Sequence, residues 1–235
     1  MKPTLINLLS DVCFRTGATP FNYQFCWNAD ARGTRRVLTK MRQCGADWFF
    51  SLEALSDALA TGRNQIFLGC GDGHSQVNRA YLNALLMKAQ PQLQIHVLRM
   101  TDHYLELTNG AFIYFIDPDS HCAALNGNVY VSEYAWADSP RHVIALAKSL
   151  SMHASHHATF YTTPSRSLEA WREYRKLRAG TNAANLIFTA EDAAASDSPL
   201  FNDDWLEQMK SELSAEDWKM LFMCEWPQAD QEQSA

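Results

Sequence analysis

The residues from Arg36 to Asp47 have the types and spacing to bind phosphate. A β-rich run ends in Lys40, a turn containing Gly45 follows, and a helical pattern begins at Trp48. A strand, a glycine turn and a helix form the layout of a phosphate-binding loop, because the N–H groups at a helix start point toward the anion. Such loops usually end Gly-Lys-Ser/Thr, whereas this one ends Gly-Ala-Asp. We therefore expect a recognisable phosphate site in which one important group has changed.

The sequence of this loop does not decide whether it binds a ligand. Lys40 or Arg42 could supply a cation beside the phosphates, whereas Ala46 stands at the usual lysine position. The amides from Gly45 to Trp48 would open the helix and face the anion. The alternative is a strand, turn and helix without a ligand, because a single glycine turn also occurs in ordinary connections.

Two further strands end in residues that suit nucleotide hydrolysis. That reaction needs an acid that holds Mg²⁺, a carboxylate that orients water and a group that senses the terminal phosphate. The apolar run from Asn128 ends in Ser132 and Glu133, so a carboxylate is present and serine replaces the usual metal-binding aspartate. A later run ends in Thr162 and Thr163, which suit a sensor or coupling loop. The alternatives are a buried strand with a polar end and an ordinary threonine turn.

The order of these motifs resembles the ATPase domain of the tailed-phage terminase large subunit, in the branch found in myophages. The phosphate loop of that branch reads Lys-Ser-Arg-Gln-Ile-Gly-Ala-Thr, and Lys40-Met-Arg-Gln-Cys-Gly-Ala-Asp47 is similar to it. Other similar segments are Glu53 to Leu68, Gly127 to Glu133, Phe160 to Ser165 and Leu221 to Glu225. The resemblance extends over about residues 14–226, nearly the whole chain.

The resemblance implies roles for particular residues. Glu133 would orient water, Thr162 and Thr163 would sense or couple, and Phe21 to Gln24 look like the segment that reads adenine. The implied cofactors are ATP and Mg²⁺, either of which could have been lost. The residues implied to bind nucleotide are Gln24, Lys40, Arg42, Gln43, Gly45, Ala46 and Asp47.

The departures from the family are reciprocal. Asp47 stands where the family has threonine, and Ser132 stands where it has aspartate; both family residues bind the same Mg²⁺. In one interpretation the metal site is inactive, because Asp47 would face phosphate oxygens and like charges about 4 Å apart cost roughly 1–4 kcal/mol. A carboxylate there also cancels part of the attraction of the helix N-terminus for phosphate. In the other interpretation Asp47 binds Mg²⁺ and Ser132 supports it; we favour the first.

The glycine-rich segment from Gly69 to Ser75 departs from the family as well. The family has a Ser-Ala-Ser-Lys-like stretch there, so this chain loses a cation and gains Asp72. The segment lacks the remaining spacing of a dinucleotide-binding loop. The change again points away from phosphate binding.

We expect a stand-alone terminase-like ATPase-domain protein whose ATP hydrolysis is lost or weakened. It would bind a phage terminase, a portal or procapsid component, or sister copies, and so interfere with or redirect packaging for a satellite, a prophage remnant or a host. The alternatives are a working packaging ATPase with a rearranged Mg²⁺ site and a decayed fragment without activity. The sequence ends where the family's nuclease domain would begin, so we expect no genome cutting.

Composition limits the class of protein further. The 235 residues are 47% hydrophobic and carry a net charge of −6. We therefore expect DNA to bind only weakly if at all, because non-specific binding depends on Lys and Arg. The six cysteines form no Cys-x-x-Cys pair, which indicates reduced thiols in a cytoplasm, here that of a bacterial host. No apolar run reaches transmembrane length, so we expect no membrane partner.

Alternating strand and helix patterns predict an α/β fold, namely a three-layer P-loop NTPase-like domain with a mainly parallel sheet and a small helical C-terminal appendage. We expect the ATPase domain over residues 1–180, a linker and helical subdomain over 181–226, and a disordered tail over 227–235. The linker is assigned to residues 179–199 because Ala, Thr, Asn, Asp and Ser dominate there. The predicted strands are Arg36–Thr39, Gln65–Gly69, Gln94–Leu98, Tyr104–Thr108, Ala111–Ile116, Asn128–Ser132 and Thr159–Thr162.

Helix signals fall between these strands. Gly62 is placed to end the helix that follows the phosphate loop, and Ser139 with Pro140 to begin another. Near the C-terminus we expect helices over Asp203–Leu213 and Ala215–Met223. We interpret three other clusters as structural: His153, His156 and His157 as an exposed turn, Asp117 and Asp119 as a turn, and Asp203 with Asp204 as a helix cap.

Overall fold

A single eight-stranded sheet forms the centre of the computed structural model, which describes residues 5–29, 35–89, 91–94, 96–180, 182–196 and 198–229. The strand order is β3-β4-β5-β2-β6-β7-β1-β8. The strands are β1 (Arg35–Lys40), β2 (Gln65–Leu68), β3 (Val97–Met100), β4 (Tyr104–Leu107), β5 (Phe112–Ile116), β6 (Asn128–Ser132), β7 (Ala158–Thr162) and β8 (Ala183–Phe188).

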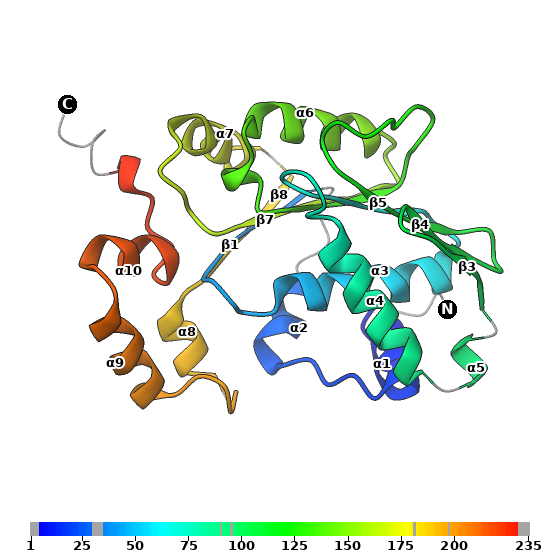
Figure 1. The fold of residues 1–235 in the computed structure, drawn as a ribbon, viewed down its shortest axis with the longest axis horizontal. Helices are drawn as coiled ribbons and strands as arrows, with labels where there is room; N and C mark the ends of the chain where they lie inside the picture. The colour runs from blue at the N-terminus through cyan, green and yellow to red at the C-terminus, as the bar shows by residue number, and fades with distance from the viewer. Residues whose placement is uncertain are drawn as a thin grey trace.

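Helices cover both faces of this sheet (Figure 1). Helices α6 and α7 lie on one face, and α1 to α4 lie on the other. The helices are α1 (Leu5–Thr16), α2 (Asn22–Ala29), α3 (Ala46–Thr61), α4 (Gln76–Lys88), α5 (Pro91–Gln94), α6 (Pro140–Leu150), α7 (Leu168–Arg178), α8 (Ala190–Ala194), α9 (Asp203–Glu212) and α10 (Ala215–Leu221), with a 3-10 turn η1 at Tyr134–Trp136.

Six neighbouring strands of the sheet, β5, β2, β6, β7, β1 and β8, pair in parallel. Strands β3 and β4 extend the sheet in antiparallel pairing. Parallel strands need crossover connections, which place helices on both faces and bury the strands completely. Strands β2, β6 and β7 are buried at every residue. The expectation of a mainly parallel α/β sheet between helical layers is confirmed.

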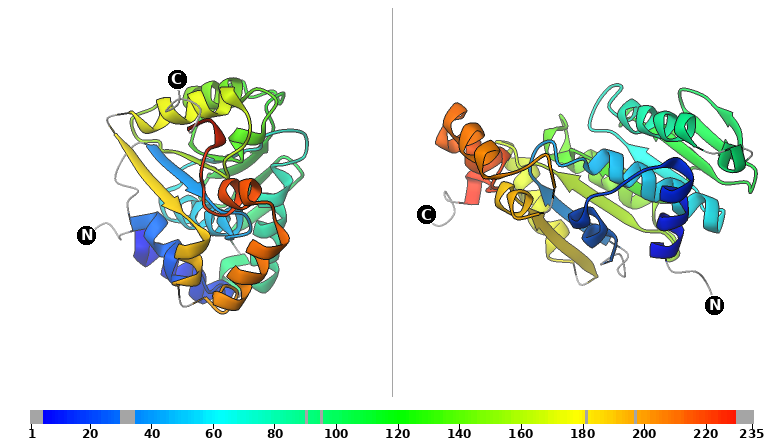
Figure 2. Two further views of the ribbon diagram at one scale, coloured as in Figure 1. Left: turned by 90° about the vertical axis from the view of Figure 1, so that its left-hand side faces the viewer. Right: turned by 90° about the horizontal axis from the view of Figure 1, so that it is seen from below.

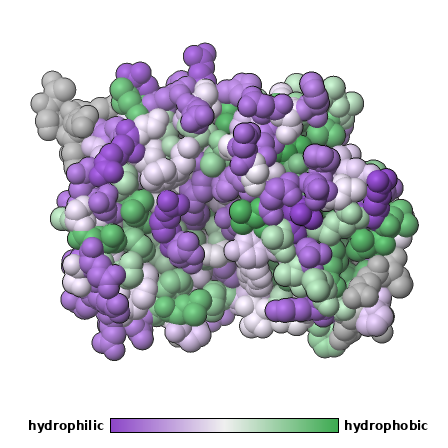
Figure 3. Space-filling model, viewed as in Figure 1, coloured by the Kyte–Doolittle hydropathy of each residue, from purple (hydrophilic) through white to green (hydrophobic). Residues whose placement is uncertain are grey.

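Side-chain alternation along the buried strands builds two separate hydrophobic cores. On β7, Tyr161 belongs to the core under α1 to α4, and its neighbour Phe160 belongs to the core under α6 and α7. Helix α7 buries Tyr174 and Leu177 on the second core and exposes Arg172 and Arg175. The upper part of the face in Figure 3 is accordingly mainly hydrophilic.

The glycines that flank α3 set its length. Gly45 precedes the helix with φ 74°, and Gly62 follows it with φ 72° and donates its N–H to Ala58 O at 3.0 Å. Both residues lie in the left-handed region, which glycine enters without a Cβ penalty. The prediction that Gly62 ends this helix is confirmed.

The linker predicted over residues 179–199 is wrong, because this segment contains β8 and α8. Strand β8 pairs with β1 over six residues in parallel register, and α8 begins with a capping box between Thr189 and Asp192. The strand lies at the sheet edge and is only partly buried, so its apolar signal is weak. The domain boundary at residue 180 stays a prediction, and β8 beyond it belongs to the main sheet.

The other differences concern short elements. The strand predicted over Gln94–Leu98 is wrong in its start: Pro91 begins the short helix α5, which includes Gln94, and β3 begins only at Val97. Asn202, rather than the two aspartates after it, caps α9 by accepting from Trp205 N at 2.8 Å. Residues 227–229 form a helical turn in which Gln228 is buried, whereas the rest of the predicted disordered tail lies outside the described residues.

The helices predicted near the C-terminus are confirmed as α9 and α10. Figure 2 shows them at one end of the molecule, with β3 and β4 at the other. Among the described residues, every helix is too short or too polar to cross a membrane.

Candidate nucleotide site

The carboxyl ends of β1, β7 and β6 lie side by side, because these strands are parallel neighbours in the sheet. Ligands of open α/β sheets bind at this edge. A pocket of about 350 Å³ opens there, between the loop after β1 and the start of α4. Its lining residues are Lys40, Arg42, Gln43, Cys44, Gly45, Ala46, Asp47, His74, Val77, Tyr81 and Glu133.

A buried ion pair forms the floor of this pocket. Lys40, at 4% exposure, donates from Nζ to Oε1 of Glu133, at 8% exposure. Lys40 Nζ also donates to Thr163 Oγ1 at 3.3 Å. The second carboxylate oxygen of Glu133 accepts from Thr163 N at 2.8 Å and Thr162 Oγ1 at 3.2 Å. The predicted cation, carboxylate and threonine pair are therefore one hydrogen-bonded unit.

The ion pair fixes both groups in their charged forms. Burial by itself would lower the pKa of Lys40, but the charge of Glu133 outweighs it and raises that pKa above its ordinary value. Burial would raise the pKa of Glu133, and the charge and hydrogen bond of Lys40 hold it below its ordinary value instead. Desolvation and attraction thus oppose each other, and attraction prevails.

The backbone at Glu133 is strained. Its φ of 50° lies in the left-handed region, which non-glycine residues seldom adopt. Its N–H donates to Tyr161 O at 2.8 Å, and the 3-10 turn η1 follows directly. This conformation ends β6 and turns the carboxylate toward Lys40.

The two residues with exchanged identities contact each other. Ser132 Oγ donates to Asp47 Oδ1 at 2.7 Å, and Tyr161 OH donates to the same oxygen at 2.8 Å. Burial, followed by the charge of Asp47, raises the pKa of Tyr161 well above its ordinary value, so its hydroxyl stays a donor. The predicted metal-binding residues therefore share one cluster, with Tyr161 as an additional member that the sequence did not reveal.

Gln24 lies behind the loop rather than in the pocket. Its Nε2 donates to the carbonyls of Cys44 and Gly45, both at 3.3 Å, and its Oε1 accepts from Phe21 N at 3.0 Å. Glycine is favoured at position 45 by its φ of 74°, and a Cβ there would also come within 2.9 Å of Gln24 Nε2 and displace the end of that side chain. In this structure Gln24 braces the loop, and its predicted contact with adenine stays a prediction.

Arg42 and Gln43 form the outer rim of the pocket. The guanidinium of Arg42 lies 4.9 Å above the ring of Trp136, which is 41% exposed and donates from Nε1 to Thr163 O at 3.0 Å. Gln43 is exposed and has φ 61°. Arg42 is thus stacked on the turn that follows Glu133.

The wall of the pocket opposite the loop was missed in the sequence. His74, Val77 and Tyr81 come from the start of α4 and the connection before it. Asp117 was interpreted as a turn residue, yet its carboxylate accepts from Gly73 N at 2.8 Å and Ser75 N at 3.2 Å and so holds this connection. The sequence signal available for this wall was the glycines of the connection and Asp117. Their role follows only from the fold, which brings Asp117 next to Gly73 and Ser75.

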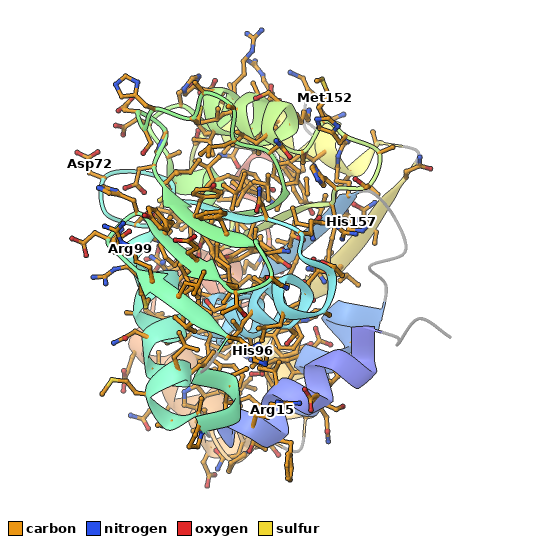
Figure 4. The ribbon with its side chains drawn as sticks, turned by 90° about the vertical axis from the view of Figure 1, so that its right-hand side faces the viewer. Arg15, Asp72, His96, Arg99, Met152 and His157 are labelled. Carbon is orange, nitrogen blue, oxygen red and sulfur yellow. The ribbon has the colours of Figure 1, made fainter. Side chains whose placement is uncertain are left out.

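The three clustered histidines are remote from the pocket. They follow α6 and precede β7, so they lie at the amino ends of the strands. Figure 4 shows His157 on one side of the molecule and Asp72, which belongs to the connection before α4, on the other. His153 and His156 contact each other through their rings at 5.3 Å in a turn.

Comparison with known proteins agrees with this geometry. A family model described as "Terminase large subunit, T4likevirus-type, N-terminal" matches residues 37–233. The protein "Terminase, ATPase subunit" of Escherichia phage P2 is 32% identical over 235 aligned positions. That alignment covers 88% of this chain and 38% of the phage P2 protein, so the chain spans about two fifths of its relative's length.

Two solved structures share the fold. The HK97 bacteriophage large terminase superposes with a TM-score of 0.70 at 10% identity, over 89% of this chain and 51% of that one. A large terminase from a thermophilic bacteriophage, in complex with ADP, gives a TM-score of 0.66 at 15% identity, over 88% of this chain and 54% of that one.

Proposed function

The chain belongs to the terminase large-subunit family, in its T4likevirus-type N-terminal region, and from this premise we propose that its pocket binds a nucleoside triphosphate which it hydrolyses poorly or not at all. The protein would act by binding other components of a phage packaging machine.

Nucleotide binding is supported by the groups that line the pocket. Gly45, Ala46 and Asp47 at the start of α3 line the same pocket as Lys40 and Arg42. The free N–H groups of a helix start together with nearby cations suit the phosphates of a nucleotide. The large terminase of the thermophilic bacteriophage, which shares the fold, was solved with ADP. Glu133 lies in the same pocket, where a carboxylate would orient the attacking water.

Weakened hydrolysis is supported by the position of the Asp47 carboxylate, and this is the observation that carries the proposal. Its Oδ1 takes hydrogen bonds from both Ser132 and Tyr161 at the start of α3. A carboxylate there opposes the phosphates that the helix N-terminus attracts. At about 4 Å the repulsion is worth roughly 1–4 kcal/mol.

The oxygen donors at this position still fit Mg²⁺, which prefers carboxylate and hydroxyl ligands. Asp47 would hold the ion with Ser132 beside it, and the ion would supply positive charge to the phosphate oxygens. Ser132 would have to turn its proton away from Asp47, because that hydrogen bond occupies the hydroxyl now.

The test is calorimetric ATP binding with and without Mg²⁺, together with ATP turnover, for wild type and for the reversed variant Asp47→Thr/Ser132→Asp. We expect wild type to bind ATP with little turnover, and the reversed variant to gain Mg²⁺-dependent affinity and turnover. Asp204→Asn, on exposed α9, is the matched charge control. Equal turnover in wild type and reversed variant would contradict weakened hydrolysis, and a wild type that binds no nucleotide would contradict the site.

A working packaging ATPase with a rearranged Mg²⁺ site is the second candidate. It is favoured by the strained Glu133, whose φ of 50° holds the carboxylate in the pocket. It predicts substantial Mg²⁺-dependent turnover in wild type that Glu133→Gln abolishes. Turnover that survives this substitution would argue against a role for Glu133 in hydrolysis.

The proposed partners are a terminase, portal or procapsid components, or further copies of this chain, with DNA at most a weak partner. Co-sedimentation with purified procapsids and sedimentation of the protein alone test these partners separately. Binding to procapsids without loss of packaging would favour a helping role, and loss of packaging would favour interference. A protein that binds none of them is a fragment without this function.

A further inference from the structure

We propose that His74 is a contact residue for the terminal phosphate of the nucleotide, to which it donates a hydrogen bond from Nε2. This inference rests on the proposed nucleotide binding. It assigns a role to the wall of the pocket at the start of α4. The residues of the phosphate loop do not form this wall.

His74 reaches the pocket from a separate element of the fold. It lies in the connection between β2 and α4 and lines the same pocket as Lys40, Asp47 and Glu133. The connection follows the carboxyl end of β2, next to β6 in the sheet. Figure 4 shows its neighbour Asp72 at the edge of the molecule, where this connection projects.

The hydrogen bond at Nδ1 of His74 defines which of its two ring nitrogens can donate. Cys70 N donates to His74 Nδ1 at 3.1 Å. A backbone N–H can only donate, so Nδ1 is the acceptor and the proton of the neutral ring is on Nε2. The imidazole thus has a donor left for a ligand in the pocket.

The connection around His74 is held in place before any ligand binds. Asp117 accepts from the N–H groups on both sides of the histidine, those of Gly73 and Ser75. A Cβ at position 69 would come within 2.5 Å of Asp117 Oδ1 and 2.9 Å of His74 Cβ, so Gly69 is required for this packing. Donors fixed in this way bind an anion without the entropy loss of ordering a loop.

The charges in the pocket explain why a neutral donor is useful there. Lys40 is paired with Glu133, and Arg42 is stacked on Trp136, so both cations already have partners. Asp47 adds a negative charge at the start of α3. A hydrogen bond from a neutral imidazole stabilises a phosphate oxygen in addition to any contact that Lys40 makes when it exchanges its partner.

The terminal phosphate is the group that fits this position. The N–H groups of the loop and the first turn of α3 are placed for the inner phosphates. Glu133 marks where a water would approach the terminal phosphate, and His74 shares the pocket with Glu133. ADP lacks the group that His74 would contact.

The experiment compares the affinities for a slowly hydrolysed ATP analogue, ATP-γ-S, and for ADP in four proteins. His74→Asn keeps an acceptor for Cys70 N but cannot reach as far as Nε2, whereas His74→Gln carries a donor at the longer reach. His103→Ala removes an exposed histidine outside the pocket and serves as the control. Wild type is the fourth protein.

We expect His74→Asn to weaken ATP-γ-S binding about tenfold to hundredfold, as for loss of a hydrogen bond to a charged group. ADP binding should change less than about threefold, and His74→Gln and His103→Ala should stay close to wild type. An equal loss for both nucleotides, or no loss, overturns the role of His74 while nucleotide binding stands. Wild type that binds neither nucleotide overturns the proposed function and this inference together.

Nitrogen-15 NMR of histidine-labelled protein gives an independent readout. We expect the Nδ1 of His74 to carry no proton, and its Nε2–H signal to shift on addition of ATP-γ-S and not on addition of ADP. A protonated Nδ1 in the nucleotide-free protein overturns the assignment of the donor.

Discussion

Two buried ion pairs start from the same strand, four residues apart, and they differ in what surrounds them. Arg36 on β1 pairs with Glu53 of α3, and Lys40 at the end of β1 pairs with Glu133 after β6. Each side chain is almost inaccessible. One pair is enclosed by the protein, and the other opens onto a pocket.

The enclosed pair has all its partners within the fold. Arg36 contacts both carboxylate oxygens of Glu53, at 2.6 and 3.1 Å, and also donates to Trp27 O and Thr159 Oγ1. Tyr130 OH donates to Glu53 at 3.0 Å. A bidentate arginine with additional hydrogen bonds is the geometry in which a buried pair offsets its desolvation.

The Lys40 pair uses a single cationic nitrogen and lies on the floor of the pocket. An ammonium is a point charge without a fixed fork, so it can exchange one anionic partner for another. The comparison indicates that β1 carries a structural pair in its buried middle and a pair suited to exchange at the end that faces the pocket.

The largest expected effect is the loss of stability when the enclosed pair is broken. Glu53→Gln leaves the Arg36 charge buried without a counter-charge, so we expect the free energy of unfolding to fall by about 3–5 kcal/mol. Urea denaturation measures this. Glu133→Gln is the matched variant at the other pair. It should lower the free energy of unfolding by less, because the ammonium of Lys40 can reach the pocket. Equal costs would remove the distinction between the pairs.

The next effect is on nucleotide affinity. Lys40→Met removes a charged hydrogen-bond donor from the pocket, which is worth about 1.5–3 kcal/mol, or roughly ten- to hundredfold in affinity. Calorimetry with ATP and ADP measures it, and Lys210→Met on exposed α9 is the control. Unchanged affinity in Lys40→Met would mean that the pair does not open for a ligand.

A smaller effect is expected at Trp136, whose ring lies under Arg42 and whose Nε1 donates to Thr163 O. Trp136→Phe keeps the stack under Arg42 but loses the hydrogen bond to Thr163 O. We expect about 0.5–1.5 kcal/mol of lost stability. Trp171→Phe is the control, since within the described residues the Nε1 of Trp171 has no hydrogen-bond partner. A larger loss for Trp171→Phe would show that ring packing, and not the Thr163 contact, determines the cost.

The smallest effect near neutral pH concerns titration of the Lys40 pair. The pKa of Glu133 is lowered from 4.5, so its contribution is present above pH 4.5 and is lost as pH falls through the lower folded value. The pKa of Lys40 is raised from 10.5, so its contribution is complete below pH 10.5 and is lost as pH rises through the higher folded value.

The difference in free energy of unfolding between wild type and Lys40→Met/Glu133→Gln should therefore be flat from about pH 5 to pH 10. Urea denaturation across this range measures it. A slope between pH 6 and pH 8 would mean that another group, such as a histidine, titrates with the pair.

The parts of the fold that the sequence predicted well are those with a strong local signal. Strands β6 and β7 are continuous apolar runs, and the glycine at position 62 ends α3. Strand β8 was missed because Ala183–Phe188 is a half-exposed edge strand within a polar segment, and its pairing with β1 joins residues far apart in sequence. Local composition does not contain that information.

The candidate site was predicted as a set of residues but not as a set of contacts. The ends of β1, β6 and β7 supplied Lys40, Glu133 and the threonines, yet the pairing of Lys40 with Glu133 spans 93 positions of the sequence. His74 was missed because its segment looked like a weakened glycine loop. Its contact with Cys70 and the two contacts of Asp117 follow only from the folded connection.

The two peptide N–H groups after Lys40 join the phosphate loop to the C-terminal part of the chain. Met41 N donates to Phe188 O at 2.8 Å, and Arg42 N donates to Leu221 O at 3.0 Å. Such amides exchange their hydrogens with deuterated water only when the local structure opens. Deuterium uptake at positions 41 and 42 over time therefore reports how often the loop and the C-terminal segments separate.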